Sequence, residues 1–179
     1  PTIMPIFGCE VYVAHRGLSF KEGKADMSGW HLILLAKNKK GYQNLIKLVS
    51  IGWVDGYYMR PRIDHEVLEK YHENLICCSA CLGGEIARKF DMGDLEGAEQ
   101  AILWHKNLFG DDYYLEMQRH PSKNPLYNPQ CYEKQKPYNA FLQQMAAKHG
   151  IKLIASNDVH FVDEDNGEAH DHLICFNTG

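Results

Sequence analysis

The chain has 179 residues, of which 45% are hydrophobic, which is enough for one domain with a buried core. It contains no apolar run near the ~20 residues of a membrane-spanning helix and no charged start leading into a short apolar segment, so we expect neither a membrane span nor a signal peptide. Its formal net charge of −4 argues against a self-sufficient DNA-binding module, which usually carries a basic stripe.

The six cysteines are irregularly spaced along the chain, at positions 9, 77, 78, 81, 131 and 175. Three of them crowd together, and several fall inside apolar segments, where a free cysteine packs as a small hydrophobic side chain. We therefore expect free thiols and a reducing, cytoplasmic compartment rather than a disulfide framework.

The first half of the chain alternates apolar runs with helical periodicity. It opens with Pro1 and passes almost at once into residues 3–8, which are predicted to begin a buried strand. Because a natural start rarely looks like this, we interpret the chain as a piece of a longer protein. The predicted strands are 3–14, 31–36 and 75–79, and the predicted helices are 42–53 and 64–71.

The second half continues the alternation. Gly83 and Gly84 are expected to open a helix, and Asp94 is the predicted N-cap of the next one. The later elements are strands over 113–117 and 151–155, helices from 138 to a cap at Gly150 and from 164 to 176, and a loop over 120–136. We predict a single domain, residues 1–179, of the α/β class, built on a barrel-like or an open sheet.

The sharpest local signal for chemistry follows the strand at 151–155. Asp158 and His160 lie two positions apart in extended chain, so their side chains project to the same side. A carboxylate and an imidazole at the C-terminal end of a strand can both reach one divalent cation, and active sites of α/β folds lie at that end. The alternative is an Asp that caps the turn and orients a neighbouring His.

A second signal, Cys81, follows the apolar run at 75–79 and precedes Gly83 and Gly84. A thiolate near a helix N-terminus has a lowered pKa and suits a soft or borderline metal. Cys78 and Cys81 also form a C-x-x-C, but Cys78 lies inside a strand, which does not favour redox chemistry. A packed, inert thiol is the remaining alternative.

Two more candidate ligands lie in the first strands. Glu10 places a carboxylate inside an otherwise apolar strand, where a buried acid needs a partner such as a metal or a base, unless it lies at an exposed edge. His31 opens the apolar run 31–36 and could equally be a core histidine. Taken together, Glu10, His31, Cys81, Asp158 and His160 predict a metal site.

The case for a functional role is weaker for the other polar residues. Arg62, beside Arg60 in a turn-rich segment, is a candidate phosphate contact, with a solvated loop as the alternative. His170 and His172 lie two apart on a predicted helix, so they are not expected to share a metal. The histidines in polar stretches are predicted to lie on the surface: His15, His65, His72, His105, His120 and His149.

Several segments in order resemble the PHP (polymerase and histidinol phosphatase) domain found in the alpha subunits of bacterial DNA polymerase III. These segments are 5–14, 31–38, 41–48, 61–64, 79–85, 157–160 and 168–171. The resemblance covers nearly the whole chain and implies a distorted (β/α)7 barrel with a metal cluster at the C-terminal ends of its strands.

The resemblance assigns the same five residues. Glu10 matches the Gly-x-Glu ligand, His31 the histidine that opens the next strand, Cys81 the His-or-Cys ligand, and Asp158 with His160 the Asp-x-His pair, which would also be catalytic. The family's first two motifs, a His-x-His followed by an Asp and a Thr-Asp-His, are absent from the sequence. We therefore expect an incomplete barrel that lacks its N-terminal strands and, taken alone, binds metal poorly and is inactive.

The resemblance also implies a function for the parent protein. That function is DNA-directed DNA polymerisation in replication, with polymerase domains after Gly179 and a PHP domain of the type uninterrupted by an exonuclease insert. The implied activity of the PHP domain is metal-dependent 3′–5′ exonuclease or phosphoesterase chemistry. Nitrogen and sulfur ligands favour zinc, with manganese or magnesium as alternatives.

The expected partners are DNA, the remaining polymerase domains and a proofreading exonuclease subunit. Two other functions stay open. One is a non-catalytic scaffold that stabilises the polymerase and docks the exonuclease, and the other is a free-standing PHP phosphatase.

Overall fold

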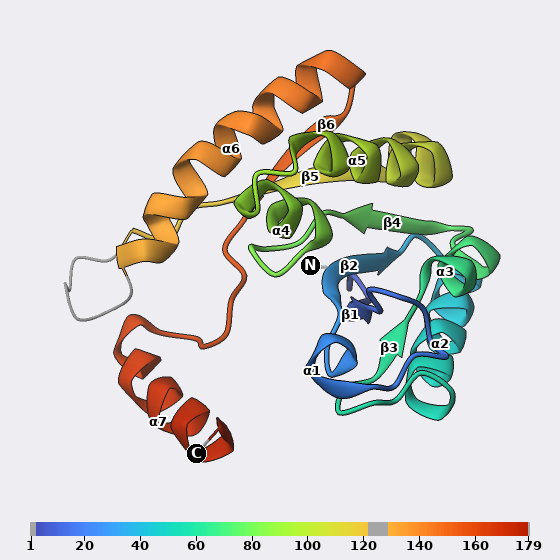
Figure 1. The fold of residues 1–179 in the computed structure, drawn as a ribbon, viewed down its shortest axis with the longest axis horizontal. Coiled ribbons are helices and arrows are strands. Elements are labelled where there is room, and N and C mark those ends of the chain that lie inside the picture. The colour runs from blue at the N-terminus through green and yellow to red at the C-terminus, as the bar shows by residue number, and fades with distance from the viewer. Residues whose placement is uncertain (1–2, 122–128, 179) are drawn as a thin grey trace.

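The computed structural model describes residues 3–121 and 129–178. Within them, six strands form one mixed sheet in the order β3-β1-β2-β4-β5-β6 (Figure 1). The strands are β1 (Gly8–Val13), β2 (Trp30–Ala36), β3 (Arg62–Ile63), β4 (Leu75–Cys78), β5 (Tyr113–Gln118) and β6 (Lys152–Ser156). The helices are α1 (Gly23–Asp26), α2 (Lys39–Val54), α3 (His65–Tyr71), α4 (Glu85–Asp91), α5 (Leu95–Phe109), α6 (Pro129–His149) and α7 (Gly167–Thr178), with 3-10 turns η1 (Gly110–Asp112) and η2 (Glu164–Asn166).

The sheet combines parallel and antiparallel pairs. β2 runs antiparallel to both of its neighbours, β1 and β4, whereas β1 with β3, β4 with β5, and β5 with β6 are parallel pairs. The α/β class is confirmed, and β2, β4, β5 and β6 lie where the apolar runs predicted strands.

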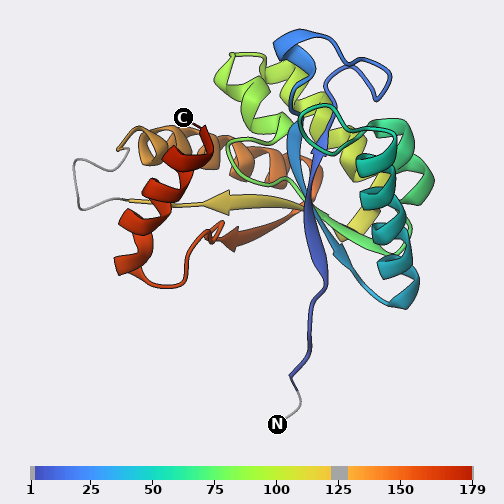
Figure 2. The ribbon, with the colours of Figure 1, turned by 90° about the horizontal axis from the view of Figure 1, so that it is seen from below.

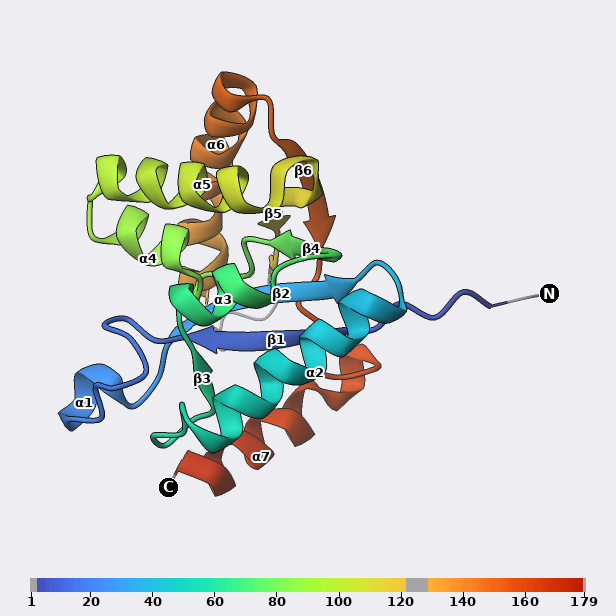
Figure 3. The ribbon, with the colours of Figure 1, turned by 90° about the vertical axis from the view of Figure 1, so that its right-hand side faces the viewer.

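The two faces of the sheet differ in what covers them. Along β1 and β2, the side chains of Val11, Val13, Leu32 and Leu34 are buried in one core with residues of α2 to α6. Figure 3 shows α2 lying against this part of the sheet, with α4 and α5 beside β4. Because side chains alternate along a strand, the residues between them project from the opposite face, which is only partly covered. We call this the open face.

Local sequence signals place several helix ends. The Asp64 side chain accepts a hydrogen bond from the Val67 amide at 3.0 Å and so caps α3. Asp94 caps α5 in the same way, through the Gly97 amide at 2.9 Å. Gly150 follows α6 with φ of 62°, a conformation that favours glycine. All three ends agree with the sequence-based predictions.

The N-terminal prediction was wrong in part. The strand begins at Gly8, and the apolar residues before it are exposed, with Ile3 at 89% and Met4 at 85% relative accessibility. Figure 2 shows this segment projecting from the body of the molecule. Its backbone nevertheless starts the pairing, since the Ala36 amide donates to the Phe7 carbonyl at 2.8 Å. Among the described residues no second layer covers it, and an apolar run is buried only where another element packs on it.

The expected loop over 120–136 was also wrong in part. Residues 122–128 lie outside the described residues, and α6 begins at Pro129, well inside the predicted loop. The first turns of α6 are polar and carry Pro137, so they show no apolar stripe. Tertiary contacts hold them instead: Lys134 pairs with Asp91 of α4 at 3.0 Å, and the buried Gln135 side chain accepts from the His120 amide at 2.7 Å.

The C-terminal helix α7 lies apart from the other helices in Figure 1. It carries large apolar side chains that are exposed, with Leu173 at 57% and Phe176 at 87% relative accessibility. Across the described ranges, no helix combines the length and the apolar character that a bilayer crossing needs.

Candidate metal centre

Three of the five predicted ligands meet at one point. The ligand atoms of Glu10, His31 and Cys81 all lie within 4.8 Å of one another. The His31 Nδ1 is 3.1 Å from the Glu10 Oε1 and 3.4 Å from the Cys81 Sγ. Donor atoms that share one zinc ion lie about 3 to 4 Å apart, so the spacing suits a common cation.

The strand register explains how Glu10 reaches His31. In the antiparallel pair β1–β2, Tyr12 lies opposite His31, so both side chains project from the open face. Glu10 is two residues from Tyr12 and therefore projects from the same face. It is the diagonal neighbour of His31, and its longer side chain closes the remaining distance.

A tight turn after β4 brings Cys81 to the same place. Ala80 is buried and has φ of 63°, a left-handed conformation that is uncommon for a residue with a Cβ atom. The Gly83 carbonyl then accepts from the His31 amide at 3.1 Å, and the Gly83 amide donates to the Cys81 Sγ at 3.3 Å. A Cβ at Gly83 would lie 2.8 Å from the His31 Nδ1, so only glycine permits this approach.

The electrostatics of the cluster suit a cation. The predicted lowering of the Cys81 pKa was wrong: burial is the main cause that raises it to about 11, and the negative charges of Asp158 and Glu10 raise it further, against the Gly83 amide. A thiol, an imidazole and a carboxylate form a donor set typical of zinc. A divalent ion would offset the repulsion between a Cys81 thiolate and the two carboxylates. The residues present therefore fit a bound metal.

Asp158 and His160 form a separate pair. The His160 Nε2 is 3.5 Å from the Asp158 Oδ1. Among the described residues, neither side chain lies within 4.8 Å of all three ligand atoms of Glu10, His31 and Cys81. Asp158 adopts φ of 46°. Burial is the main cause that raises the pKa of Cys81 and of Cys131, and the charge of Asp158 raises both further. The carboxylate therefore lies on the Cys81 side of the site, whereas the His160 side chain is 61% exposed.

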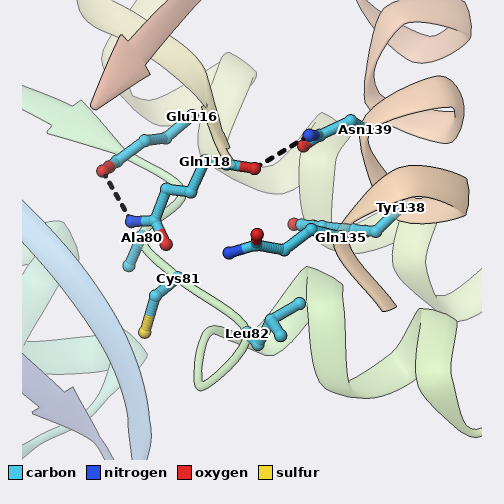
Figure 4. Close-up of a pocket in the computed structure, with 8 residues that line it drawn as sticks. All are labelled: Ala80, Cys81, Leu82, Glu116, Gln118, Gln135, Tyr138 and Asn139. Carbon is cyan, nitrogen blue, oxygen red and sulfur yellow. Dashed lines mark hydrogen bonds between the residues drawn. The ribbon is translucent and has the colours of Figure 1, made fainter. Parts of the chain in front are cut away.

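Sequence reasoning missed an acid beside the cluster, Glu116 of β5, although it lies in a predicted strand. It is buried, and its carboxylate accepts hydrogen bonds from Gln118 Nε2 at 3.1 Å and from the Ser156 hydroxyl. Figure 4 shows Glu116 and Gln118 lining a small pocket together with Cys81. A carboxylate in an apolar strand, the signal that found Glu10, was present here too.

The prediction for Arg62 was wrong. Its side chain is fully buried, and its guanidinium donates to the backbone carbonyls of Gly56, Asp26 and Phe20 at 2.8 to 3.1 Å. A group committed to three carbonyls in the core is not available to a phosphate. A different cation, Arg88 of α4, lines a groove between α4 and α6 that opens beside His31.

The six cysteines are free thiols, as expected. Burial, followed by the charge of Glu116, raises the pKa of Cys78 to about 12. Because a neutral thiol is a poor nucleophile, this disfavours the redox reading of Cys78 and Cys81.

The prediction that His105 lies on the surface was wrong, whereas the His65 side chain is 37% exposed. His105 is 2% exposed, and His65 is partly buried between Trp30 and Trp104. Burial lowers the pKa of His105 to about 4. The spacing of His105 from Ala101 and Ile102 places it on the buried face of α5, a signal that the surface prediction did not use.

The fold is that of an α/β domain whose cluster offers a donor set that fits a metal, and the comparison with known families agrees. The family model described as the PHP domain matches residues 2–120. The chain belongs to the PHP domain family.

Several longer proteins, all described as DNA polymerase III subunit alpha, are similar to this chain over nearly its whole length. The DNA polymerase III subunit alpha of Borreliella burgdorferi is 44% identical over 180 residues, covering 99% of this chain and 15% of that protein. The proteins of the same description from Deinococcus radiodurans and Thermus aquaticus are each 36% identical, over 98% of this chain and over 13% and 14% of their own lengths. The chain thus spans about a seventh of these relatives.

Proposed function

We propose that this chain is part of the alpha subunit of a bacterial DNA polymerase III, a DNA-directed DNA polymerase, and that its PHP domain binds divalent metal. One observation carries the metal proposal: Glu10, His31 and Cys81 place three different ligand atoms within 4.8 Å of one another. The similarity over 98–99% of the chain to polymerase alpha subunits supports the first part.

We infer that the open face of the sheet is the interior of the distorted (β/α)7 barrel of this family. Helices α2 to α6 share a core with one face, and Glu10, His31, Cys81 and Glu116 gather at the other. In such a barrel the helices cover the outer face of the sheet, and the active site lies at the strand ends on the inner side. The helix-covered face of this sheet would therefore be the outside of the barrel, and the open face the inside.

Zinc is the favoured ion, with manganese or magnesium as alternatives. The imidazole of His31 and the thiolate of Cys81 are ligands that zinc accepts and that magnesium, which prefers oxygen, does not. Asp158, whose charge acts on the Cys81 thiol, would add a further carboxylate, and His160 would join it as the second member of the Asp-x-His pair.

The activity we propose for the domain is metal-dependent phosphoester hydrolysis, removing nucleotides from a 3′ end. A bound divalent ion would supply a Lewis acid that polarises a phosphoryl oxygen and neutralises developing charge. Arg88, which lines the groove beside His31, would attract the phosphates of a DNA strand. Asp158 would orient the His160 ring, whose exposure lets it exchange a proton with water or substrate.

A second candidate function is a non-catalytic scaffold that docks the remaining polymerase domains and a proofreading exonuclease subunit. The exposed apolar side chains of α7, Leu173 and Phe176, favour it, because exposed apolar surface marks contact sites. In that case metal would serve folding rather than hydrolysis.

The variant Asp158→Asn, made in the full-length polymerase subunit that we propose contains this chain, separates the two functions. For the enzyme, we expect release of nucleotides from a 3′-labelled DNA strand to fall at least about 100-fold while primer extension and thermal stability are retained. If the domain is a scaffold, we expect Asp158→Asn to lose zinc and thermal stability, and the parent protein to show no nuclease activity. Asp165→Asn, an exposed acid in η2, is the matched control. A full chain with no primer extension would contradict the polymerase assignment.

A further inference from the structure

A second group of ligand-type side chains lies on the helical side of the sheet. The ligand atoms of His65, Glu85 and His105 lie within 4.8 Å of one another, and His65 and Glu85 are the first residues of α3 and α4. His105 lies in α5 and stacks on Tyr113, whose ring belongs to the core. The first cluster is on the open face, so the two groups are separate.

The protonation of His105 follows from its hydrogen bond. Its Nδ1 lies 2.8 Å from the Ala101 carbonyl oxygen, and a carbonyl can only accept, so Nδ1 carries the hydrogen. In the neutral ring the Nε2 then presents a lone pair. That Nε2 is buried and has no hydrogen-bond partner among the described residues, in a side chain only 2% exposed. A buried polar atom without a partner costs free energy, which a bound ligand would recover.

The other two residues face the same point. The His65 Nε2 is also buried without a hydrogen bond among the described residues and lies 3.4 Å from the Glu85 Oε2, an ion-pair distance. The other Glu85 oxygen, Oε1, is turned to Lys89 at 3.7 Å. The rings of His65 and His105 are 6.1 Å apart and nearly perpendicular. Two imidazole nitrogens and one carboxylate oxygen therefore converge.

We propose that His65, Glu85 and His105 bind a divalent transition-metal ion of the zinc class, at a site distinct from the Glu10, His31 and Cys81 cluster. Two histidines and one glutamate form a known zinc donor set, which leaves a fourth position for water. A pocket lined by His65, Glu85 and Trp104 gives the ion and a water molecule access from solvent. Because the ligands come from α3, α4 and α5, the ion would fasten these three helices together.

The site is tested with Co²⁺ as the probe, because a thiolate ligand gives Co²⁺ a charge-transfer absorption that nitrogen and oxygen ligands do not. We expect His65→Gln and Glu85→Gln in the full chain each to lose one bound Co²⁺ per chain and to keep the thiolate band. We expect Cys81→Ser to lose the thiolate band and keep the ion that His65→Gln removes. His172→Gln, an exposed histidine of α7, is the matched control and should change neither.

Amide hydrogen exchange supplies the second measurement. Zn²⁺ should slow exchange in α3 and α5 by about tenfold or more in the parent chain and not in His65→Gln, since an ion that binds only the folded helices stabilises them. The proposal is overturned if Co²⁺ stoichiometry is the same in the parent, His65→Gln and Glu85→Gln chains, or if Zn²⁺ slows exchange equally in the parent and His65→Gln. The three residues would then form a cluster that binds no metal.

Discussion

The Cys81 Sγ lies 3.4 Å from the His31 Nδ1, although 50 positions separate the two residues. His31 is near the start of β2, and Cys81 follows the end of β4. These strands are antiparallel neighbours, with Ile33 paired to Cys78, so the start of one and the end of the other meet at the same edge of the sheet. The meeting depends on strand direction, because a parallel pair would have placed the two residues at opposite edges.

Cys81→Ser should weaken zinc binding at the first cluster by about 100-fold, because a neutral hydroxyl replaces a thiolate ligand. Cys81→His should retain most of the affinity, since an imidazole is also a zinc ligand. Competition with a chromophoric chelator measures both. Cys175→Ser, at an exposed cysteine of α7, is the control, and equal affinity in Cys81→Ser and Cys175→Ser would remove Cys81 from the ligand set.

Gly83→Ala should reduce zinc affinity at the first cluster by about tenfold or more. The new Cβ would lie 2.8 to 3.0 Å from the His31 ring, so the imidazole must move away from Glu10 and Cys81. The same competition titration measures the loss. Gly167→Ala, whose Cβ would meet nothing closer than 3.7 Å, should leave the affinity unchanged. If Gly83→Ala bound zinc as tightly as the parent chain, the position of the His31 ring would not determine zinc affinity.

Arg62→Leu should lower the free energy of unfolding by about 3 kcal/mol or more, because three backbone carbonyls lose their donors in the core. Denaturant unfolding measures the change. Arg60→Leu, at an exposed neighbour, should stay within about 0.5 kcal/mol of the parent chain. If Arg62→Leu instead kept its stability and lost affinity for DNA, the phosphate role that the structure argues against would return.

Stability should fall in acid through Asp26. Hydrogen bonds from Arg16, at 2.5 and 3.0 Å, lower the pKa of this buried carboxyl from its ordinary 3.8 to about 2, assisted by the Glu22 amide. A pKa that is lower in the folded state stabilises the fold above about pH 4, and this contribution is lost as the pH falls through 4 toward 2.

The variant Arg16→Gln tests this carboxyl. It should unfold at a lower temperature than the parent chain at pH 6, and this difference should shrink as the pH falls from 4 to 2, because Asp26 of the parent chain becomes increasingly protonated. Arg60→Gln should run parallel to the parent chain across the range. A constant difference between Arg16→Gln and the parent chain from pH 6 to pH 2 would contradict the assignment.

The elements that local chemistry controls could be predicted from the sequence. The apolar runs of β2, β4, β5 and β6 alternate or persist over strand lengths, and Asp64, Asp94 and Gly150 end helices through their own side chains or φ angle. Such signals need only near neighbours. The first turns of α6 were missed because they are polar and are held by Asp91 and His120, which lie far away in the sequence.

The candidate site divides in the same way. Residue type and position within or beside an apolar strand selected Glu10, His31 and Cys81, because an acid inside such a strand or a thiol after one needs a partner. The burial of Arg62 and the convergence of His65, Glu85 and His105 had no such signal. A polar side chain in a polar stretch looks the same in the sequence whether it meets solvent or a distant carbonyl, and only tertiary packing decides which.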